Sequence, residues 1–152
     1  MANHSLAITI QYATAALEAR WKPILTTRKI KRWASIALKT SSNITIRIVG
    51  SAESRRLNRE YRNKDYSTNI LTFSYPELDD GIQADLVICM PVLVKEAKSQ
   101  KKSLENHFIH LLIHGLLHAQ GFDHEDAVEA QAMESLEITL LSQLGLENPY
   151  LS

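Results

Sequence analysis

The sequence predicts an α+β fold: a single domain, residues 1–152, with a mixed sheet of about four strands packed against about five helices. Some segments alternate apolar and polar residues with the period of a strand, and others repeat apolar residues with the period of a helix. A length of 152 residues favours one hydrophobic core over two. The composition, 45% hydrophobic and 22% charged, excludes disordered, collagen-like and disulfide-rich classes.

Four segments have the composition of strands. The clearest is NITIRIV at residues 43–49, because Ile44, Ile46 and Ile48 fall on one face. Two later segments are separated by the turn-rich sequence PELDDG. The predicted strands are residues 6–12, 43–49, 70–75 and 85–90. The sequence does not predict their order in the sheet.

Five segments repeat apolar residues at helical spacing. Ser51 and Ser103 are the expected N-caps of two of them, and Pro91 suits the first turn of a third. Gly121 is expected to end the longest helix as a left-handed cap. The predicted helices are residues 26–39, 51–61, 91–100, 104–120 and 125–144. The last one is expected to face the core with Val128, Ala132, Leu136, Leu140 and Leu144.

The sequence favours the cytoplasm as the compartment. Cys89 is the single cysteine, so no disulfide can form within the chain, and the N-terminus lacks the cationic start of a secretory signal. Because no apolar run approaches the length of about 18 residues that crosses a bilayer, we expect no membrane association.

The net charge of zero conceals an uneven distribution. Residues 1–102 contain all 17 basic side chains and nine acidic ones, whereas residues 103–152 contain eight acidic and no basic side chains. The densest basic cluster lies in the predicted helix 51–61 and just beyond it. Such asymmetry suits one basic surface for a polyanion, and it equally suits two halves that attract each other within the fold.

Five of the six histidines lie between residues 107 and 124. His114 and His118, four residues apart on a predicted helix, can both direct a ring nitrogen at one metal ion, as in a zincin-like metal-binding helix. Gly121 would end that helix and allow His124 to fold back as a third ligand. Three histidines leave a fourth position open, as in catalytic zinc sites. His107 and His110 are expected to pack or to support ligands rather than to bind the metal.

The residue after the first of these histidines bears on the class of reaction. Metzincin proteases place a glutamate there as general base, whereas this chain has Gly115, so peptide hydrolysis is disfavoured. A metal-activated water can still attack a phosphodiester, whose charge requires nearby cations. Asp123 and Asp85 are candidates for orienting an imidazole or the water. The alternative for both residues is an ordinary solvated position without a role in the site.

Three motifs resemble a known family. HGLLHAQGFDH, LNREYRNKDYSTNILTFSYPE and ADLVICMPVLVKEA are similar to segments of the bacterial YbeY endoribonuclease family, the rRNA maturation factors. The resemblance extends from about residue 44 to the closing NPYL. It departs from the family's usual pattern at Phe122, often tyrosine there, and at Ala84, usually glycine.

The resemblance implies a single-strand-specific, zinc-dependent endoribonuclease, with one zinc ion per chain. It also implies a role in maturation of the 3′ end of small-subunit rRNA and in ribosome quality control. The implied metal ligands are His114, His118 and His124, and the implied functional arginine is Arg62, in YRNKD. The implied partners are single-stranded RNA, rRNA and the ribosome or its small subunit.

Two alternatives remain open from the residues themselves. One is a non-catalytic, zinc-containing ribosome assembly factor, in which the metal mainly stabilises the fold. The other is a metallopeptidase with a base from outside the histidine helix. The sequence identifies no general base, no oligomeric state and no cleavage site, and imidazole ligands also bind nickel, copper and iron.

Overall fold

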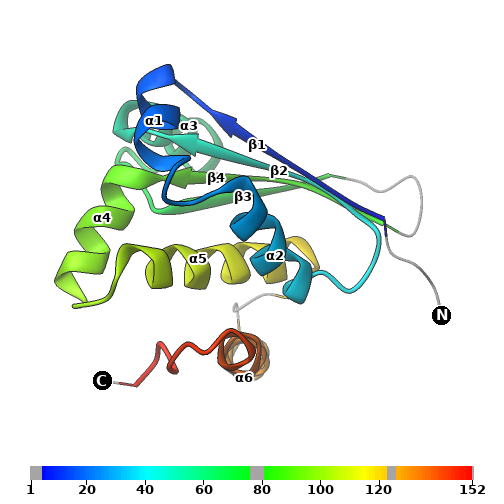
Figure 1. Cartoon of the computed structure of the whole chain (residues 1–152). Coiled ribbons are helices and arrows are strands. Elements are labelled where there is room, and N and C mark those ends of the chain that lie inside the picture. Colours follow the sequence, from blue (N-terminus) through cyan, green and yellow to red (C-terminus); the bar gives the residue numbers. More distant parts are fainter. Residues whose placement is uncertain (1–4, 76–80, 123–125, 152) are drawn as a thin grey trace.

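The computed structural model describes residues 5–75, 81–122 and 126–151, and it forms an α+β fold of one sheet and six helices within those ranges (Figure 1). In chain order, the elements are β1 (Leu6–Tyr12), α1 (Ala15–Trp21), α2 (Thr27–Ala37), β2 (Ser42–Val49), α3 (Ser51–Arg62), β3 (Ile70–Tyr75), β4 (Ile82–Cys89), α4 (Met90–Ser99), α5 (Leu104–Ala119) and α6 (Ala127–Gln143). The four predicted strands and five predicted helices are confirmed, with ends shifted by a few residues.

The sheet is mixed, as predicted, and its strand order is β1-β2-β4-β3. β2 pairs in parallel with β1 and with β4, and β3 pairs with β4 in the antiparallel direction. The register places Phe73 of β3 opposite Asp85 of β4, and Asp85 opposite Thr45 of β2. β3 is therefore an edge strand, with one side of its backbone facing away from the sheet.

The two faces of the sheet are covered differently. One face packs Ile44, Ile46 and Leu86 into the main core, which also takes in α2 and α5. The opposite face holds a smaller cluster around Val87 and Leu71, on the side of α3. In Figure 1, α5 runs along the lower face of the sheet and α6 lies beyond it. None of the described helices is long and apolar enough to cross a membrane.

Helix α5 approaches the sheet closely at one point. A Cβ atom added to Gly115 would lie 2.6 Å from Ile70 Cδ1 and 2.9 Å from Leu86 Cδ2. The caps predicted for this helix are confirmed: Ser103 Oγ accepts a hydrogen bond from the Asn106 N–H, and Gly121 has a φ of 96°. Gly115 and these caps together place α5 and fix both of its ends.

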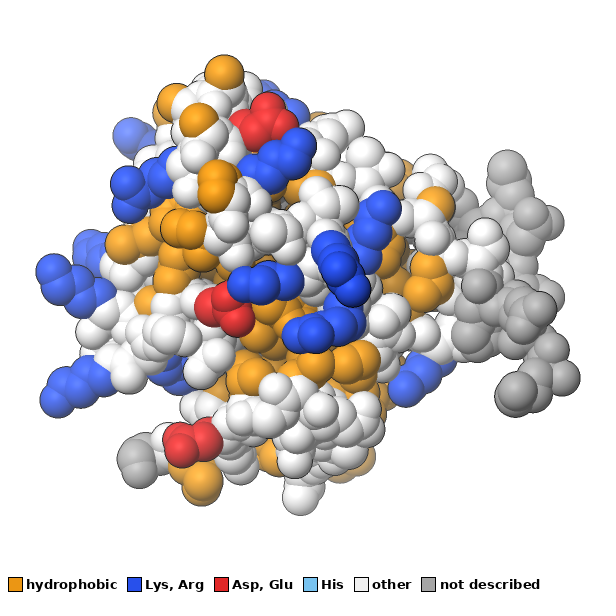
Figure 2. All heavy atoms as spheres, in the orientation of Figure 1, with side chains coloured by type: hydrophobic (Ala, Val, Ile, Leu, Met, Phe, Trp, Pro, Cys, Tyr) orange, Lys and Arg blue, Asp and Glu red, His pale blue; other side chains and the backbone are white. Residues whose placement is uncertain are grey.

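Basic side chains gather on the outer surface of α2, as its periodicity indicates. Figure 2 shows lysine and arginine side chains on this face of the molecule, and Arg28, Lys31 and Arg32 are exposed there. The opposite side of the helix buries Ile30 and Trp33 in the core.

Three sequence expectations are corrected by the structure. α1 was not predicted, because a helix of seven residues, capped by Thr14, gives almost no periodicity. Ser51 is the first helical residue of α3 rather than its cap, which is Gly50. The predicted face of α6 is confirmed only in its second half: Leu140 is buried and Leu136 and Leu144 pack against the core, whereas Val128 and Ala132 are exposed. Met133, Glu137 and Leu141 are buried in addition.

Candidate functional site

A cavity of about 420 Å³ opens between the edge strand β3, the histidine face of α5 and the C-terminal segment. It brings Arg62, at the end of α3, together with His114 and His118, which are more than fifty residues away in the sequence. The lining residues come from four parts of the chain: Arg62; Thr68, Asn69, Ile70, Leu71 and Thr72; His110, Leu111, His114 and His118; and Tyr150.

The histidines of α5 form one continuous row, as their spacing predicts. Ring centroids are 6.4 Å apart between His107 and His110, 6.4 Å between His110 and His114, and 4.8 Å between His114 and His118. All three neighbouring pairs meet edge to face. His114 and His118, the two predicted ligands on the helix, are the closest pair and both line the cavity.

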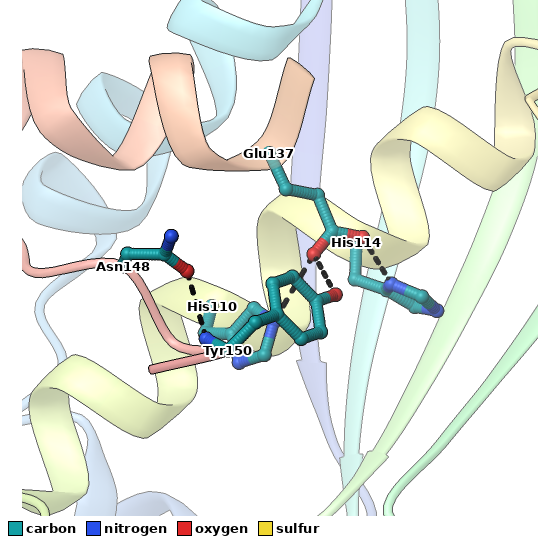
Figure 3. A network of polar contacts seen from close by, with 5 residues as sticks. All are labelled: His110, His114, Glu137, Asn148 and Tyr150. Carbon is teal, nitrogen blue, oxygen red and sulfur yellow. Dashed lines mark hydrogen bonds and ion pairs between the residues drawn. The ribbon is translucent and has the colours of Figure 1, made fainter. Parts of the chain in front are cut away.

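A carboxylate from α6 holds two of these histidines (Figure 3). The Glu137 side chain is 0% exposed, and one of its oxygens forms a hydrogen bond with His114 Nδ1. The other oxygen lies 3.2 Å from His110 Nε2 and 2.5 Å from the hydroxyl of Tyr150. Tyr150 also packs its ring against His110, at 5.8 Å between centroids. One buried acid therefore connects α5, α6 and the C-terminal segment.

The charge of Glu137 determines which atoms donate in this network. Burial alone would raise the pKa of Glu137, but hydrogen bonds from His110, His114 and Tyr150 outweigh it and lower the pKa to about 2. The ionised carboxylate can only accept hydrogen bonds. In this hydrogen bond, His114 Nδ1 therefore carries the proton and is the donor, and Glu137 is the acceptor. In that tautomer, Nε2 of His114 is the ring nitrogen with a lone pair for a metal ion. Burial and the bond to Glu137 raise the pKa of Tyr150.

His107 belongs to a separate network. Its Nε2 lies 2.9 Å from Glu96 Oε1, and the same carboxylate accepts from the side-chain amide of Asn69. The His107 side chain is 4% exposed and does not line the cavity. The expectation that His107 packs rather than binds metal agrees with this position.

Arg62 differs from the other arginines of α3. Arg55 forms a bidentate ion pair with Asp65, Arg56 pairs with Glu60, and Arg59 lies 3.8 Å from Asp65. Arg62, in contrast, forms no ion pair with any residue that the structure describes, and it is the one arginine of this helix that lines the cavity. Arg62 therefore forms no salt bridge with Glu60 or Asp65, the acidic residues nearest to it in the sequence.

Two further sequence expectations concern residues around the histidines. A glutamate at position 115 would point into Ile70 and Leu86 of the sheet, so this position cannot supply a peptidase base. Asp85 does not orient an imidazole, because it lies on the α3 face of the sheet and accepts a hydrogen bond from the Tyr75 hydroxyl at 2.7 Å.

His124 and Asp123 lie outside the described residues. Within those residues, no three His, Cys, Asp or Glu side chains are grouped as a metal site. Of the three predicted ligands, the described part of the chain therefore contains two, His114 and His118.

Two residues of the site were not found from the sequence. Glu137 lies four residues after Met133 and three before Leu140, so it occupies the buried stripe of α6. An acid on a stripe of core residues is the signal that could have identified it. Tyr150, in the closing NPYL, gives no periodic signal, because it follows the last helix.

Comparisons with known proteins agree with the resemblance. The family model described as "Endoribonuclease YbeY" matches residues 8–145. Two relatives named "Endoribonuclease YbeY" are similar over almost their whole length. The one from Aromatoleum aromaticum is 51% identical over 98% of this chain and 95% of its own, and the one from Polynucleobacter asymbioticus is 46% identical over 99% and 97%.

The fold also has a solved counterpart. The solution structure of TM1509 from Thermotoga maritima matches with a TM-score of 0.59 and 19% identity, covering 95% of this chain and 96% of that one. At this identity, the match shows that the fold is shared. The match of the family model, together with the near-complete relatives at 51% and 46% identity, shows that the chain belongs to the YbeY family of endoribonucleases.

Proposed function

We propose that this chain is a single-strand-specific, metal-dependent endoribonuclease whose active site is the cavity between β3, α5 and Tyr150. As a member of its family, it is an endoribonuclease, a hydrolase that acts on phosphodiester bonds of RNA and has a role in rRNA processing. The proposal adds three things: the residues that take part in the reaction, the metal ion, and the preference for single-stranded RNA.

One observation carries the proposal: the buried Glu137 carboxylate fixes the ring of His114 while that ring lines a cavity containing Arg62. A histidine that binds a metal usually donates its second ring nitrogen to a carboxylate, which fixes the tautomer and strengthens the ligand. A histidine buried only for packing needs no orientation toward a cavity. The arrangement of His114 is therefore the one expected of a metal ligand.

His114, His118 and His124 are the proposed ligands, and zinc is the proposed metal, with one ion per chain. Neutral imidazoles suit zinc, and the tautomer set by Glu137 fits this use of His114. The chemistry that zinc supplies when bound is that of a Lewis acid, which eases deprotonation of water and withdraws charge from a phosphoryl oxygen. Glu137 is a positioning residue, because it acts on the reaction only through His114 and His110.

Arg62 is the proposed catalytic residue. Its guanidinium lacks a carboxylate partner among the described residues and lies at the same cavity as His114 and His118. A guanidinium can hold two phosphate oxygens at once, which positions the scissile group and offsets the charge that develops on it. Arg59 and Lys64, nearby in the sequence, would add to the local positive potential.

The wider biological setting is proposed with the function. The substrate is rRNA at the small ribosomal subunit, with maturation of its 3′ end and ribosome quality control as the processes. Residues 1–152 act as a single endoribonuclease domain in the cytoplasm. The buried, unpaired thiol of Cys89 suits a reducing compartment.

The test measures bound metal and RNA cleavage on the same protein samples. Metal content is determined by mass spectrometry, and cleavage is followed with an end-labelled single-stranded RNA and its duplex. The variants are His114→Ala and Arg62→Ala. Arg56→Ala is the matched control, since Arg56 lies on the same helix and pairs with Glu60.

We expect one zinc ion per chain in the unsubstituted protein and in Arg62→Ala, and less in His114→Ala. Cleavage of the single strand is lost in both variants and kept in Arg56→Ala. Zinc binding without cleavage of any RNA by the purified protein would overturn the proposal in favour of a non-catalytic assembly factor.

A further inference from the structure

The α3 face of the sheet carries a group of aromatic side chains that the active site does not use. Tyr61, on α3, is 65% exposed, and Tyr75, at the end of β3, is 43% exposed. Phe73 lies between them on β3 and meets the Tyr61 ring edge to face, at 5.1 Å between centroids. We call Tyr61, Phe73 and Tyr75 the aromatic group. It lies on the far side of the edge strand from the histidines of α5.

The rings of the aromatic group are held in place. The hydroxyl of Tyr75 donates to Asp85 Oδ2 at 2.7 Å, and Asp85 stands opposite Phe73 in the β3–β4 register. That hydrogen bond is the main cause that raises the pKa of Tyr75 to about 12, and Tyr61 is near enough to contribute. Phe73 packs at the border of the smaller core cluster. Ordered, neutral rings at the surface lose little freedom when they bind a flat ligand.

One cation, Arg62, adjoins the aromatic group on the side of the cavity. Arg62 directly follows Tyr61 at the end of α3 and lines the cavity with His114. Arg55 and Arg59 lie on the same helix and are more than half exposed, although both lie against Asp65. The edge of β3 thus has aromatic rings on one face, histidines on the other, and Arg62 reaching the cavity from the helix that carries Tyr61.

We propose that the aromatic group is a stacking surface for unpaired bases of the RNA strand whose scissile phosphate lies at Arg62. The inference rests on the proposed function and deepens it by giving a reason for the preference for single strands. Exposed rings beside a basic surface are how proteins bind single-stranded nucleic acid, because bases stack on the rings while cations contact the backbone. In a duplex, the base faces are already stacked, so the aromatic group can contact only a strand with free bases.

A polyanion fits this surface better than an apolar protein segment does. Arg62 directly follows Tyr61 and forms no ion pair with a described residue, so an apolar partner covering this end of α3 would bury that charge without compensation. A phosphate neutralises the charge of Arg62, and the neighbouring bases supply flat faces for the rings.

The experiment measures RNA binding without cleavage. In a His114→Ala background, we would measure the dissociation constants of a labelled single-stranded RNA and of the same sequence as a duplex, by fluorescence anisotropy. Tyr61→Ala removes the most exposed ring, and Tyr61→Trp keeps a ring. Ile24→Ala is the control for loss of exposed apolar surface, because Ile24 is 49% exposed and lies between α1 and α2.

We expect Tyr61→Ala to weaken binding of the single strand by about 5- to 150-fold, the range that loss of one stacked base gives, with little change for the duplex. Tyr61→Trp should bind the single strand as tightly as the parent. Its indole should be quenched by that strand and not by the duplex. Trp21 and Trp33 are buried, so the new tryptophan supplies the exposed signal.

Equal losses for single strand and duplex in Tyr61→Ala, or no loss for either, would overturn the stacking surface. Melting temperatures of each variant show whether the fold is kept. The two proposals fail separately. Cleavage by the unsubstituted protein, with unchanged binding in Tyr61→Ala, rejects only the stacking surface. Ring-dependent binding of single strands by a protein that never cleaves RNA rejects only the proposed catalytic function.

Discussion

Two histidines of α5 each pair with a glutamate from another helix, and the two pairs have opposite patterns of burial. In the pair near its beginning, the His107 side chain is 4% exposed and that of Glu96 is 32% exposed. In the pair near its end, the His114 side chain is 26% exposed and that of Glu137 is 0% exposed. The first pair turns its carboxylate outward, and the second turns its imidazole toward a cavity.

This contrast in burial separates a histidine that packs in the core from the one that we propose as a metal ligand. A buried histidine needs a polar partner, and Glu96 provides one from the edge of the core. A buried carboxylate has a high desolvation cost, which three donors from His110, His114 and Tyr150 offset. The protein tolerates this buried charge at the position where it fixes a ring that faces the cavity.

The largest effect that we predict separates the two histidines. His114→Ala should lower RNA cleavage by more than about 100-fold, because loss of a ligand exceeds the effect of losing a residue that merely supports one. His107→Ala should keep its metal and instead lower the free energy of unfolding, by about 1–3 kcal/mol, because Glu96 loses a buried partner. Cleavage rates and urea unfolding measure the two effects. If His107→Ala lost its metal and His114→Ala kept it, the roles assigned to the two histidines would be contradicted.

The two carboxylates should differ in the same way, with a smaller effect. Glu137→Gln should weaken zinc binding by about 10- to 100-fold, because a neutral amide orients His114 less strongly. Glu96→Gln is the matched control and should bind zinc as the unsubstituted protein does. Competition with a chromophoric chelator measures both dissociation constants. Equal zinc affinities for the two variants would remove the special role of the buried acid.

The position of α5 against the sheet underlies both pairs. Gly115→Leu should lower the free energy of unfolding by about 1–3 kcal/mol, because the new side chain would overlap Ile70 and Leu86. Leu116→Ala would instead leave a cavity on the same helix, which makes it a comparison for loss rather than excess of volume. Thermal melts measure both. A Gly115→Leu variant as stable as the parent would show that α5 can shift at this point.

The smallest effect concerns the hydroxyl of Tyr150. Tyr150→Phe should lower the free energy of unfolding by about 1 kcal/mol, since Glu137 keeps two of its three donors. Tyr75→Phe removes a hydroxyl that bonds the more accessible Asp85, so its effect should be smaller still. Chemical denaturation of the two variants provides the measurement. A larger loss in Tyr75→Phe would contradict the weight given to the buried acid.

The sequence predicted the parts of the site that depend on local spacing. The row of histidines follows from residues three and four apart on one helix, and the left-handed end of that helix follows from Gly121. Arg62 came from the resemblance in YRNKD, and the structure places it at the histidine cavity. Local spacing and motifs were sufficient for these residues.

The rest depends on contacts between distant segments. The order β1-β2-β4-β3 follows from pairings that no local pattern encodes. Glu137 was missed because periodicity assigns acids to the solvent, and Val128 was assigned to the core although it is exposed. The donors that make a buried acid stable come from α5 and from the segment after α6, so the sequence around Glu137 does not show them.

The measurement that tests the central claim most directly is the NMR spectrum of the imidazole nitrogens during a zinc titration. We predict that one equivalent of zinc shifts Nε2 of His114 together with ring nitrogens of His118 and His124. His114 Nδ1 should stay protonated by its bond to Glu137, and His107 should not change. Zinc that shifts His107, or that leaves His114 unchanged, would contradict the account.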